Sequence, residues 1–256
     1  PALATLLNNL PDPIDMTTAI AAYDRITRIL ALKLRRNWLD WLEAAPQPGS
    51  PKYSVKDAGI RRLRGLAAKT LALFEDDAYR QQLLEKHNNA DNMTVRINVL
   101  HALNTRHDQY REAALAAYYE RYRAQPLVVD KWFAIQAKDE SEGALERITA
   151  LAEHPDFHVD NPNRFRALVG TLMQANPTIF HAADGSGYRF VAGQIRRVLL
   201  SNPQIAARML NGYAIVSRMD SVRKALVKTE LEALTAVENI SIDVREVLER
   251  LQRGLT

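Results

Sequence analysis

The sequence predicts an all-α fold, arranged as an irregular superhelix of antiparallel helix pairs. Apolar residues recur every three or four positions through most of the 256 residues, and no segment alternates with the period of two that strands require. Short loops separate the predicted helices, which favours antiparallel neighbours stacked as in a solenoid of the HEAT or armadillo type. We find no fixed repeat length, so the array should be irregular.

The first strong pattern lies between residues 18 and 41. It consists of Ile20, Tyr23, Ile26, Leu30, Leu34, Trp38 and Trp41. This spacing predicts one long amphipathic helix, which the Pro- and Gly-containing segment 46–50 ends. We expect Trp38 and Trp41 to belong to the core, with a docking patch for a further domain as the alternative.

The next helix should begin at Ser54, a residue suited to N-capping. Its apolar residues again fall on one side: Ile60, Leu63, Leu66, Ala67, Thr70, Leu71 and Phe74. Three later helix starts are marked by an Asn-Pro pair, at Asn161, Asn176 and Asn202. Further helices are predicted over about residues 76–89, 93–104, 108–123, 127–137, 141–154, 187–200, 220–237 and 242–253.

Composition narrows the class of protein. The chain is 47% hydrophobic, and we treat residues 1–256 as a single α-helical domain, although one array or two small domains would both suit this length. No apolar run approaches the roughly 20 residues of a membrane span. The absence of cysteine excludes disulfides and is compatible with a cytoplasmic protein.

Nucleic-acid binding is not expected from the charge pattern. The net charge of +4 arises from 34 basic and 30 acidic residues that are interleaved along the chain. The dense basic run at residues 61–64 contains no aromatic side chain on which a base could stack.

The histidines offer weak candidates for a catalytic site. His154 and His158 are four apart, but Pro155 and Asp156 intervene and no adjacent glutamate could serve as a general base. A hydrolase that uses His101, His107 and Asp108 is a minor alternative, because no G-x-S-x-G nucleophile turn accompanies them. The turn at residues 184–187 lacks the P-loop lysine and is better explained as a glycine turn that enters the next helix.

Five sequence patches carry a family resemblance. They are NPNRFRALVG (161–170), FHAADGSGY (180–188), LVVDKWF (127–133), NPQIAAR (202–208) and DNMT (91–94). By their residues and their order along the chain, these patches resemble the C-terminal helical domain of the aminopeptidase N group of zinc exopeptidases. The resemblance spans most of the chain, which lacks the family's H-E-x-x-H and G-x-M-E-N motifs.

The resemblance implies a non-catalytic piece of a longer enzyme, with the catalytic zinc domain absent from this chain. We therefore expect no cofactor here, zinc in the parent enzyme, and no peptide cleavage by this chain alone. The implied partners are the catalytic domain of the same polypeptide and peptide substrates, with no nucleic acid and no membrane.

Within such an enzyme, this domain would form a wall of the closed substrate chamber. By the matching of motifs, Arg166 and Arg208 resemble the arginines that line that chamber. A guanidinium can hold a peptide's carboxylate or carbonyls through paired hydrogen bonds. Gln204 lies four residues before Arg208 and should share its helix face. For Arg166 an inter-helix salt bridge is the alternative.

The main alternative for the whole chain is a free-standing helical scaffold that binds a protein or peptide on its concave face. An upstream H-E-x-x-H, followed eighteen residues later by a glutamate, would distinguish the enzyme from the scaffold.

Overall fold

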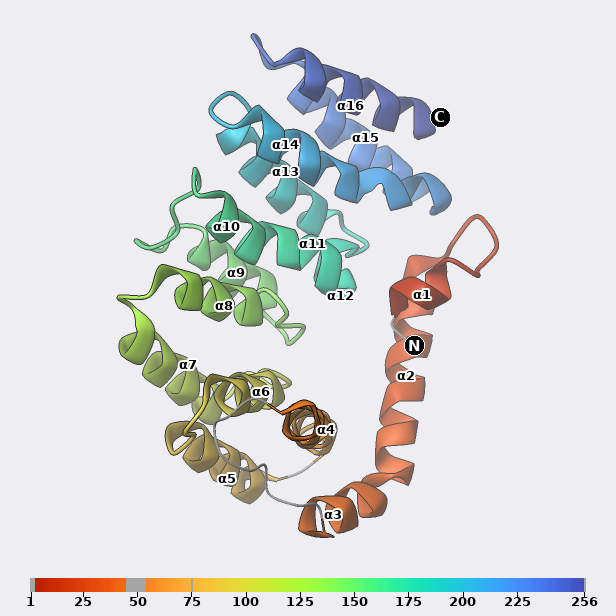
Figure 1. The fold of residues 1–256 in the computed structure, drawn as a ribbon. Coiled ribbons are helices and arrows are strands. Elements are labelled where there is room, and N and C mark those ends of the chain that lie inside the picture. Colours follow the sequence, from red (N-terminus) through yellow and green to blue (C-terminus); the bar gives the residue numbers. More distant parts are fainter. Residues whose placement is uncertain (1–2, 45–53, 75, 256) are drawn as a thin grey trace. The chain divides into compact units, whose positions relative to one another are not determined.

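The computed structural model describes residues 3–44, 54–74 and 76–255, and the regular elements within these ranges are helices (Figure 1). The described backbone contains one isolated parallel bridge, between Ile14 and Met219, and no strand. The all-α prediction is confirmed. Two compact units can be distinguished, and each is described on its own.

One unit comprises Asp24–Glu142. It contains most of α2 (Met16–Lys33), followed by α3 (Arg35–Ala44), α4 (Val55–Leu71), α5 (Asp77–Asn88), α6 (Met93–Leu103), α7 (Gln109–Tyr122) and α8 (Pro126–Gln136). Helix α6 packs against α4, α5 and α7, while α5 also packs against α7 and α7 against α8. Contacts with both the next helix and the one after it are typical of stacked helical repeats.

The other unit comprises Pro1–Tyr23 and Gly143–Thr256. Beyond α1 (Leu3–Leu7), its elements are α9 (Ala144–Leu151), α10 (Pro162–Phe165), the π-helical turn η1 (Arg166–Gly170), α11 (Thr171–Ala175), α12 (Pro177–Phe180), α13 (Ser186–Val198), α14 (Pro203–Leu210), the 3-10 helix η2 (Asn211–Arg218), α15 (Ser221–Thr235) and α16 (Ile242–Gly254). Helix α13 packs on α14 and α15, and α16 packs on the same two helices (Figure 1).

Hydrogen bonds tie the beginning of the chain to this second unit. The guanidinium of Arg218 donates to the carbonyl oxygens of Leu7 (3.3 Å) and Leu10 (2.8 Å) and to the carboxylate of Asp12 (2.9 Å). The backbone N–H of Ile14 in turn donates to the carbonyl of Arg218 at 2.7 Å. Segments about 200 residues apart in sequence are thereby joined within one unit.

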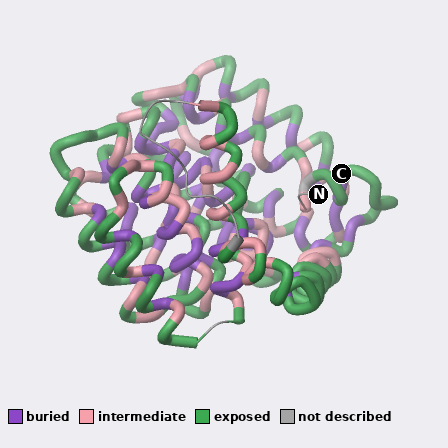
Figure 2. Tube along the Cα trace, turned by 60° about the horizontal axis from the view of Figure 1, so that its bottom comes forward, coloured by how far each residue is buried: buried purple, intermediate pink, exposed green. Residues whose placement is uncertain are grey.

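Each unit has a core rich in aromatic residues, and buried positions recur along the helices (Figure 2). Tyr118 and Phe133 are fully buried in the first unit. In the second unit, the rings of Phe180 and Tyr188 meet edge to face at 5.2 Å, and Tyr213 lies 5.6 Å from Phe180. Such aromatic pairs fix neighbouring helices beyond the effect of buried area alone.

The predicted helix over residues 18–41 is two helices. Helix α2 ends at Lys33, and α3 begins at Arg35. The expectation that Trp38 and Trp41 belong to the core is wrong, because both are only half-buried; their rings pack edge to face at 6.4 Å. The predicted apolar stripe is also largely exposed at Ile26 and Leu30.

Only part of the predicted apolar side of α4 is buried: Leu71 is buried as predicted, but two of the large residues are not. Leu63 and Leu66 are exposed, whereas Ala67 and Ala68 are buried. The physical reason is a close approach to α6: a Cβ atom at Gly65 would lie 2.6 Å from the side chain of Asn98. Small residues allow this approach, so the larger ones are turned outward.

The three Asn-Pro helix starts are confirmed. The side chains of Asn161, Asn176 and Asn202 each accept hydrogen bonds from backbone N–H groups in the following turn. The helix predicted from residue 141 begins later, at Ala144, because Gly143 adopts a left-handed conformation with φ +71° just before it.

Candidate functional site

The NPNRFRALVG patch forms a short α-helical start followed by a π-helical turn. The side chain of Asn161 accepts hydrogen bonds from the backbone N–H of Asn163 at 3.0 Å and of Arg164 at 3.3 Å. Arg164 is buried and donates to the carbonyl oxygen of Asp156. The backbone then widens into η1, which begins at Arg166. Single π-helical turns occur frequently at functional sites.

Arg166 is the predicted chamber residue that this turn positions. Its side chain is half-buried, with Nε donating to the carbonyl of Pro162 at 3.1 Å and Nη2 donating to Asn163. These partners belong to its own helical segment, and no inter-helix salt bridge of Arg166 occurs among the described residues. Within the described residues, the side chain of Arg166 is thus held by its own helical segment.

Arg208 and Gln204 lie on the exposed face of α14. Ile205, Ala206, Met209 and Leu210 form the buried face of that helix. Arg208 and Gln204 are both exposed, as their spacing of four residues predicts, and within the described chain Arg208 forms no hydrogen bond or ion pair. The guanidinium of Arg208 is therefore available to an external ligand.

The segment carrying Arg166 lies next to the helix carrying Arg208. A Cβ atom at Gly170 would lie 3.6 Å from Cβ of Arg166 and 3.5 Å from Sδ of Met209. The side chain of Met209 thus lies against η1 at the turn where Arg166 begins. The structure places the three predicted residues on adjoining elements of one unit.

The FHAADGSGY patch has a structural role. Asp184 accepts hydrogen bonds from the backbone N–H and the hydroxyl of Ser186, and Gly185 has a left-handed φ of +72°. At Gly187 a Cβ atom would lie 2.2 Å from the carbonyl oxygen of Ile179, so only glycine allows this approach of α12 and α13. The prediction of a glycine turn that enters a helix is confirmed.

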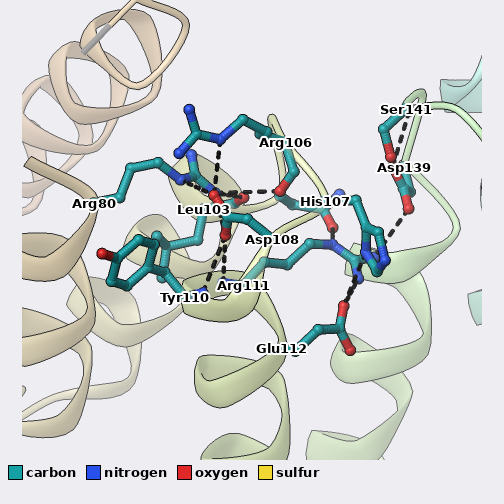
Figure 3. Close-up of polar contacts among 11 residues, drawn as sticks. Arg80, Leu103, Arg106, His107, Asp108, Tyr110, Arg111, Glu112, Asp139 and Ser141 are labelled. Carbon is teal, nitrogen blue, oxygen red and sulfur yellow. Dashed lines mark hydrogen bonds and ion pairs between the residues drawn. The ribbon is translucent and has the colours of Figure 1, made fainter. Parts of the chain in front are cut away.

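No catalytic triad is assembled around Asp108 in the described chain (Figure 3). Its Oδ1 atom accepts hydrogen bonds from Nη2 of Arg80 at 3.0 Å and from the backbone N–H groups of Tyr110 and Arg111. Its Oδ2 atom accepts from Nε of Arg106 at 2.8 Å. Asp108 is thereby an N-cap and an ion-pair partner.

His107 contacts a different carboxylate, and His101 is held in its neutral form by burial. Nδ1 of His107 lies 3.2 Å from Oε1 of Glu112 rather than beside Asp108. Burial, together with the charges of Lys138 and Lys69, lowers the pKa of His101 to about 4. The alternative hydrolase that uses His101, His107 and Asp108 is therefore not supported by the geometry.

The described residues contain neither a cluster of potential metal ligands nor a helix that could span a membrane. No three side chains among His, Asp and Glu come together there in a group that could hold a metal ion. Nδ1 of His154 instead accepts a hydrogen bond from the backbone N–H of Asp156 at 3.1 Å, and the side chain of His158 is exposed. No described helix is long and apolar enough to cross a membrane.

A set of buried arginines joins helices, and the sequence did not predict it. Arg80 donates to the carbonyl of Leu103, Arg96 to that of His87, and Arg223 to that of His181. Arg111 reaches the side chains of Asn104 and Asp139. An arginine on the otherwise apolar side of a predicted helix is the signal that could have revealed them.

These features define a class of protein: an all-α array of stacked helices with exposed arginines on one unit and no metal-ligand group in its described part. A family model described as "Domain of unknown function (DUF3458_C) ARM repeats" matches residues 1–253. The chain belongs to this family.

Relatives of known activity extend this assignment. Aminopeptidase N of Haemophilus influenzae is 39% identical over 200 residues, 78% of this chain and 23% of that protein. The Caulobacter vibrioides aminopeptidase N is 38% identical over 193 residues, 75% of this chain and 22% of that protein. The Escherichia coli aminopeptidase N is 31% identical over 261 residues, 98% of this chain and 30% of that protein.

A solved structure is similar over nearly the whole chain. The crystal structure of Legionella pneumophila aminopeptidase A in complex with aspartic acid superimposes with a TM-score of 0.87 at 27% sequence identity, covering 99% of this chain and 30% of that one. The chain thus spans between 22% and 30% of the length of these relatives. The resemblance to the C-terminal helical domain of an aminopeptidase N is confirmed.

Proposed function

We propose that this chain forms one wall of the substrate chamber in a zinc aminopeptidase that releases N-terminal residues from peptides. The chain itself supplies no catalytic group. Arg208, with Arg166 and Gln204, contacts the part of the peptide that lies away from the scissile bond. The observation that carries the proposal is the exposed guanidinium of Arg208, unpaired within the described chain, beside the π-helical turn that positions Arg166.

The chemistry of these side chains suits a peptide's carboxyl end. A guanidinium presents several N–H donors in a plane and can form two parallel hydrogen bonds with a carboxylate. Its charge is permanent, so binding would persist across the working pH of a peptidase. The amide of Gln204 adds a donor and an acceptor on the same face of α14, suited to the peptide's backbone groups.

Zinc belongs to the part of the enzyme outside this chain under this proposal. The described residues do not fit a zinc site, because no three potential ligands converge. The catalytic domain would belong to the same polypeptide, and the enzyme would be cytoplasmic; fractionation of cells tests the latter point.

Kinetics of the complete parent enzyme test the role of the arginines. Arg208→Ala should raise KM about ten- to a hundred-fold for a tripeptide with a free carboxylate, the range expected when a charge-assisted hydrogen bond is lost. Hydrolysis of an alanine-linked chromogenic amide, which lacks that carboxylate, should change little. Arg166→Ala should also raise KM for the tripeptide. Arg166→Lys should raise it less, because the lysine keeps the positive charge.

Arg245→Ala is the matched control, because Arg245 is also an exposed arginine of the same unit but lies on α16. It should leave both substrates unaffected. Equal effects of Arg208→Ala on the tripeptide and the amide, or no effect on either, would contradict the proposal.

A second experiment tests the non-catalytic assignment. The 256-residue chain should not hydrolyse the chromogenic amide and should bind no stoichiometric zinc, whereas mixing with a separately produced N-terminal portion of the parent should restore or reshape activity. Cleavage by this chain alone would overturn the assignment and direct attention back to its histidines.

A further inference from the structure

A cavity of about 180 Å³ lies between η2, α15 and α16, within the unit that contains residues 143–256. Its wall is mainly apolar and includes the side chains of Tyr213, Leu231, Leu251 and Leu255, all of which are buried. An apolar cavity of about 150 Å³ can hold a benzene molecule, so this one has room for a ligand of roughly six to ten non-hydrogen atoms.

The polar groups in the wall of this cavity differ in what they can offer a ligand. The hydroxyl of Tyr213 donates to the carbonyl oxygen of Tyr188 at 2.9 Å, and the hydroxyl of Ser217 donates to a backbone carbonyl three residues earlier at 2.8 Å. The guanidinium of Arg250 uses only Nη2, which donates to Oδ1 of Asn211, among the described residues. Its remaining N–H groups are open to a ligand in the cavity.

The hydrogen bond to Asn211 also holds Arg250 in place at the mouth of the cavity. Arg250 is exposed and belongs to α16, whereas Asn211 begins η2. The side chain of Asn211 is itself fixed, because its Nδ2 atom donates to the carbonyl oxygen of Ala207 at 3.0 Å. A guanidinium that is already ordered loses less conformational freedom when a ligand binds.

We infer that this cavity binds a small carboxylic acid with an aliphatic or aromatic body. The apolar body fills the space beside Leu231 and Leu251, and the carboxylate accepts charge-assisted hydrogen bonds from Arg250. A neutral molecule of the same shape lacks the ionic part of this contact, and a cationic one is repelled by the guanidinium.

This inference goes beyond the proposed function and does not rest on it. The cavity is built from η2, α15 and α16, and its wall includes none of the three residues assigned to the substrate chamber, Arg166, Arg208 and Gln204. Binding in the cavity can therefore be measured on this chain alone, without peptide hydrolysis.

Isothermal titration calorimetry of the 256-residue chain with 4-methylpentanoate tests the inference. The expected dissociation constant is about 0.1–10 mM, as for other ligands of this size. The uncharged isostere 4-methylpentanamide should bind at least about ten-fold more weakly, because it forms no charge-assisted hydrogen bond.

A pair of arginine variants tests the charged part of the site. Arg250→Gln should weaken the binding of 4-methylpentanoate about ten-fold or more and leave that of the amide nearly unchanged. Arg245→Gln is the matched control, since Arg245 is an exposed arginine of the same helix that does not line the cavity. It should leave the affinity for both compounds unchanged.

A pair of glycine variants tests the apolar part of the site. Gly254 lines the cavity, and an added Cβ there would make an ordinary contact, 3.6 Å from Cβ of Ser217. Gly254→Leu should therefore fill the cavity and abolish binding. Gly193→Leu is the control, because Gly193 lies on α13 with nothing within 4 Å of an added Cβ; it should bind 4-methylpentanoate normally.

Three results would each overturn the inference. They are the absence of saturable binding of 4-methylpentanoate up to about 10 mM, equal affinities for the carboxylate and the amide, and undiminished binding by Gly254→Leu. Circular dichroism of each variant before titration establishes that it is folded. The arginine pair and the glycine pair are independent, so either pair alone decides the question if a variant of the other does not fold.

Discussion

The Nη2 atom of Arg80 on α5 donates a hydrogen bond of 3.0 Å to the Oδ1 atom of Asp108, the residue that caps α7. The side chain of Arg80 is fully buried, while that of Asp108 is largely so. Burial acts to raise the pKa of Asp108, but hydrogen bonds from Arg80, Arg111 and Arg106 outweigh it and hold that pKa below the ordinary value of an aspartate. One contact therefore joins two helices and keeps a capping carboxylate charged.

Removal of Arg80 should strongly destabilise the unit that contains it. We expect Arg80→Ala to lower the free energy of unfolding by about 3–5 kcal/mol, because it leaves a capping carboxylate and several carbonyls without their buried donor. Arg106→Ala is the control: its partly exposed guanidinium binds the same carboxylate, and its loss should cost under about 1 kcal/mol. Urea denaturation of the 256-residue chain measures both, and equal losses would contradict this account.

The stability of the chain should fall in mild acid through His181. Burial, followed by the charge of Arg223, lowers the pKa of His181 to about 3, so the folded state holds the neutral form. The unfolded chain binds a proton near the ordinary value of about 6.5. The contribution of His181 is therefore present in full above pH 6.5 and is lost as pH falls from 6.5 towards about 3.

His181→Gln should flatten this part of the stability profile, whereas His158→Gln, at an exposed position, should leave it unchanged. Thermal unfolding recorded at intervals between pH 7 and pH 4 separates the two variants. If the stability of His181→Gln falls with pH as steeply as that of the unmodified chain, another group causes the loss of stability in acid.

Two helical glycines should respond in opposite directions to the same substitution. At Gly187 an added Cβ would lie 2.2 and 2.7 Å from the carbonyl oxygens of Ile179 and Phe180. These are backbone atoms, so relieving the clash would require the helices to move apart. Gly187→Ala should therefore destabilise the chain by about 2 kcal/mol or more. At Gly193 nothing lies within 4 Å, so Gly193→Ala should stabilise it by about 0.5–1 kcal/mol, as measured by calorimetry.

The chain alone should self-associate at high concentration. Ile26 and Leu30 on α2 are 56% and 52% exposed, and exposed aliphatic side chains in water promote association. Light scattering should show a mass above that of the monomer at high concentration, with Ile26→Asp and Leu30→Asp together reducing it and Thr27→Asp having little effect. A strictly monomeric mass for the unmodified chain at high concentration would count against this prediction.

The helix starts could be predicted from the sequence because their cause is local. Asn161 and Asn202 cap the helices that follow them through contacts within three residues. A short stretch of sequence is therefore enough to predict each of these helix starts. The positions of Arg208 and Gln204 on one exposed face follow from helical spacing for the same reason. What these two residues bind is a prediction that rests on the family resemblance.

The features that the sequence did not reveal depend on distant partners. Nothing near Arg218 indicates that it binds the carbonyls of Leu7 and Leu10, more than 200 residues earlier. The outward turn of Leu66 on α4 likewise follows from the close approach of Gly65 to Asn98, which lies on α6. Hydrophobic periodicity locates a helix but does not say which neighbour it will meet.

The buried arginines also place an unequal demand on the two residues that each of them joins. Arg80, Arg96 and Arg223 bind carbonyl oxygens of Leu103, His87 and His181, and a carbonyl is present whatever side chain the residue bears. Each such joint thus specifies the identity of only one of its two members. A substitution at the acceptor residue therefore leaves the hydrogen bond available, whereas a substitution of the arginine removes it.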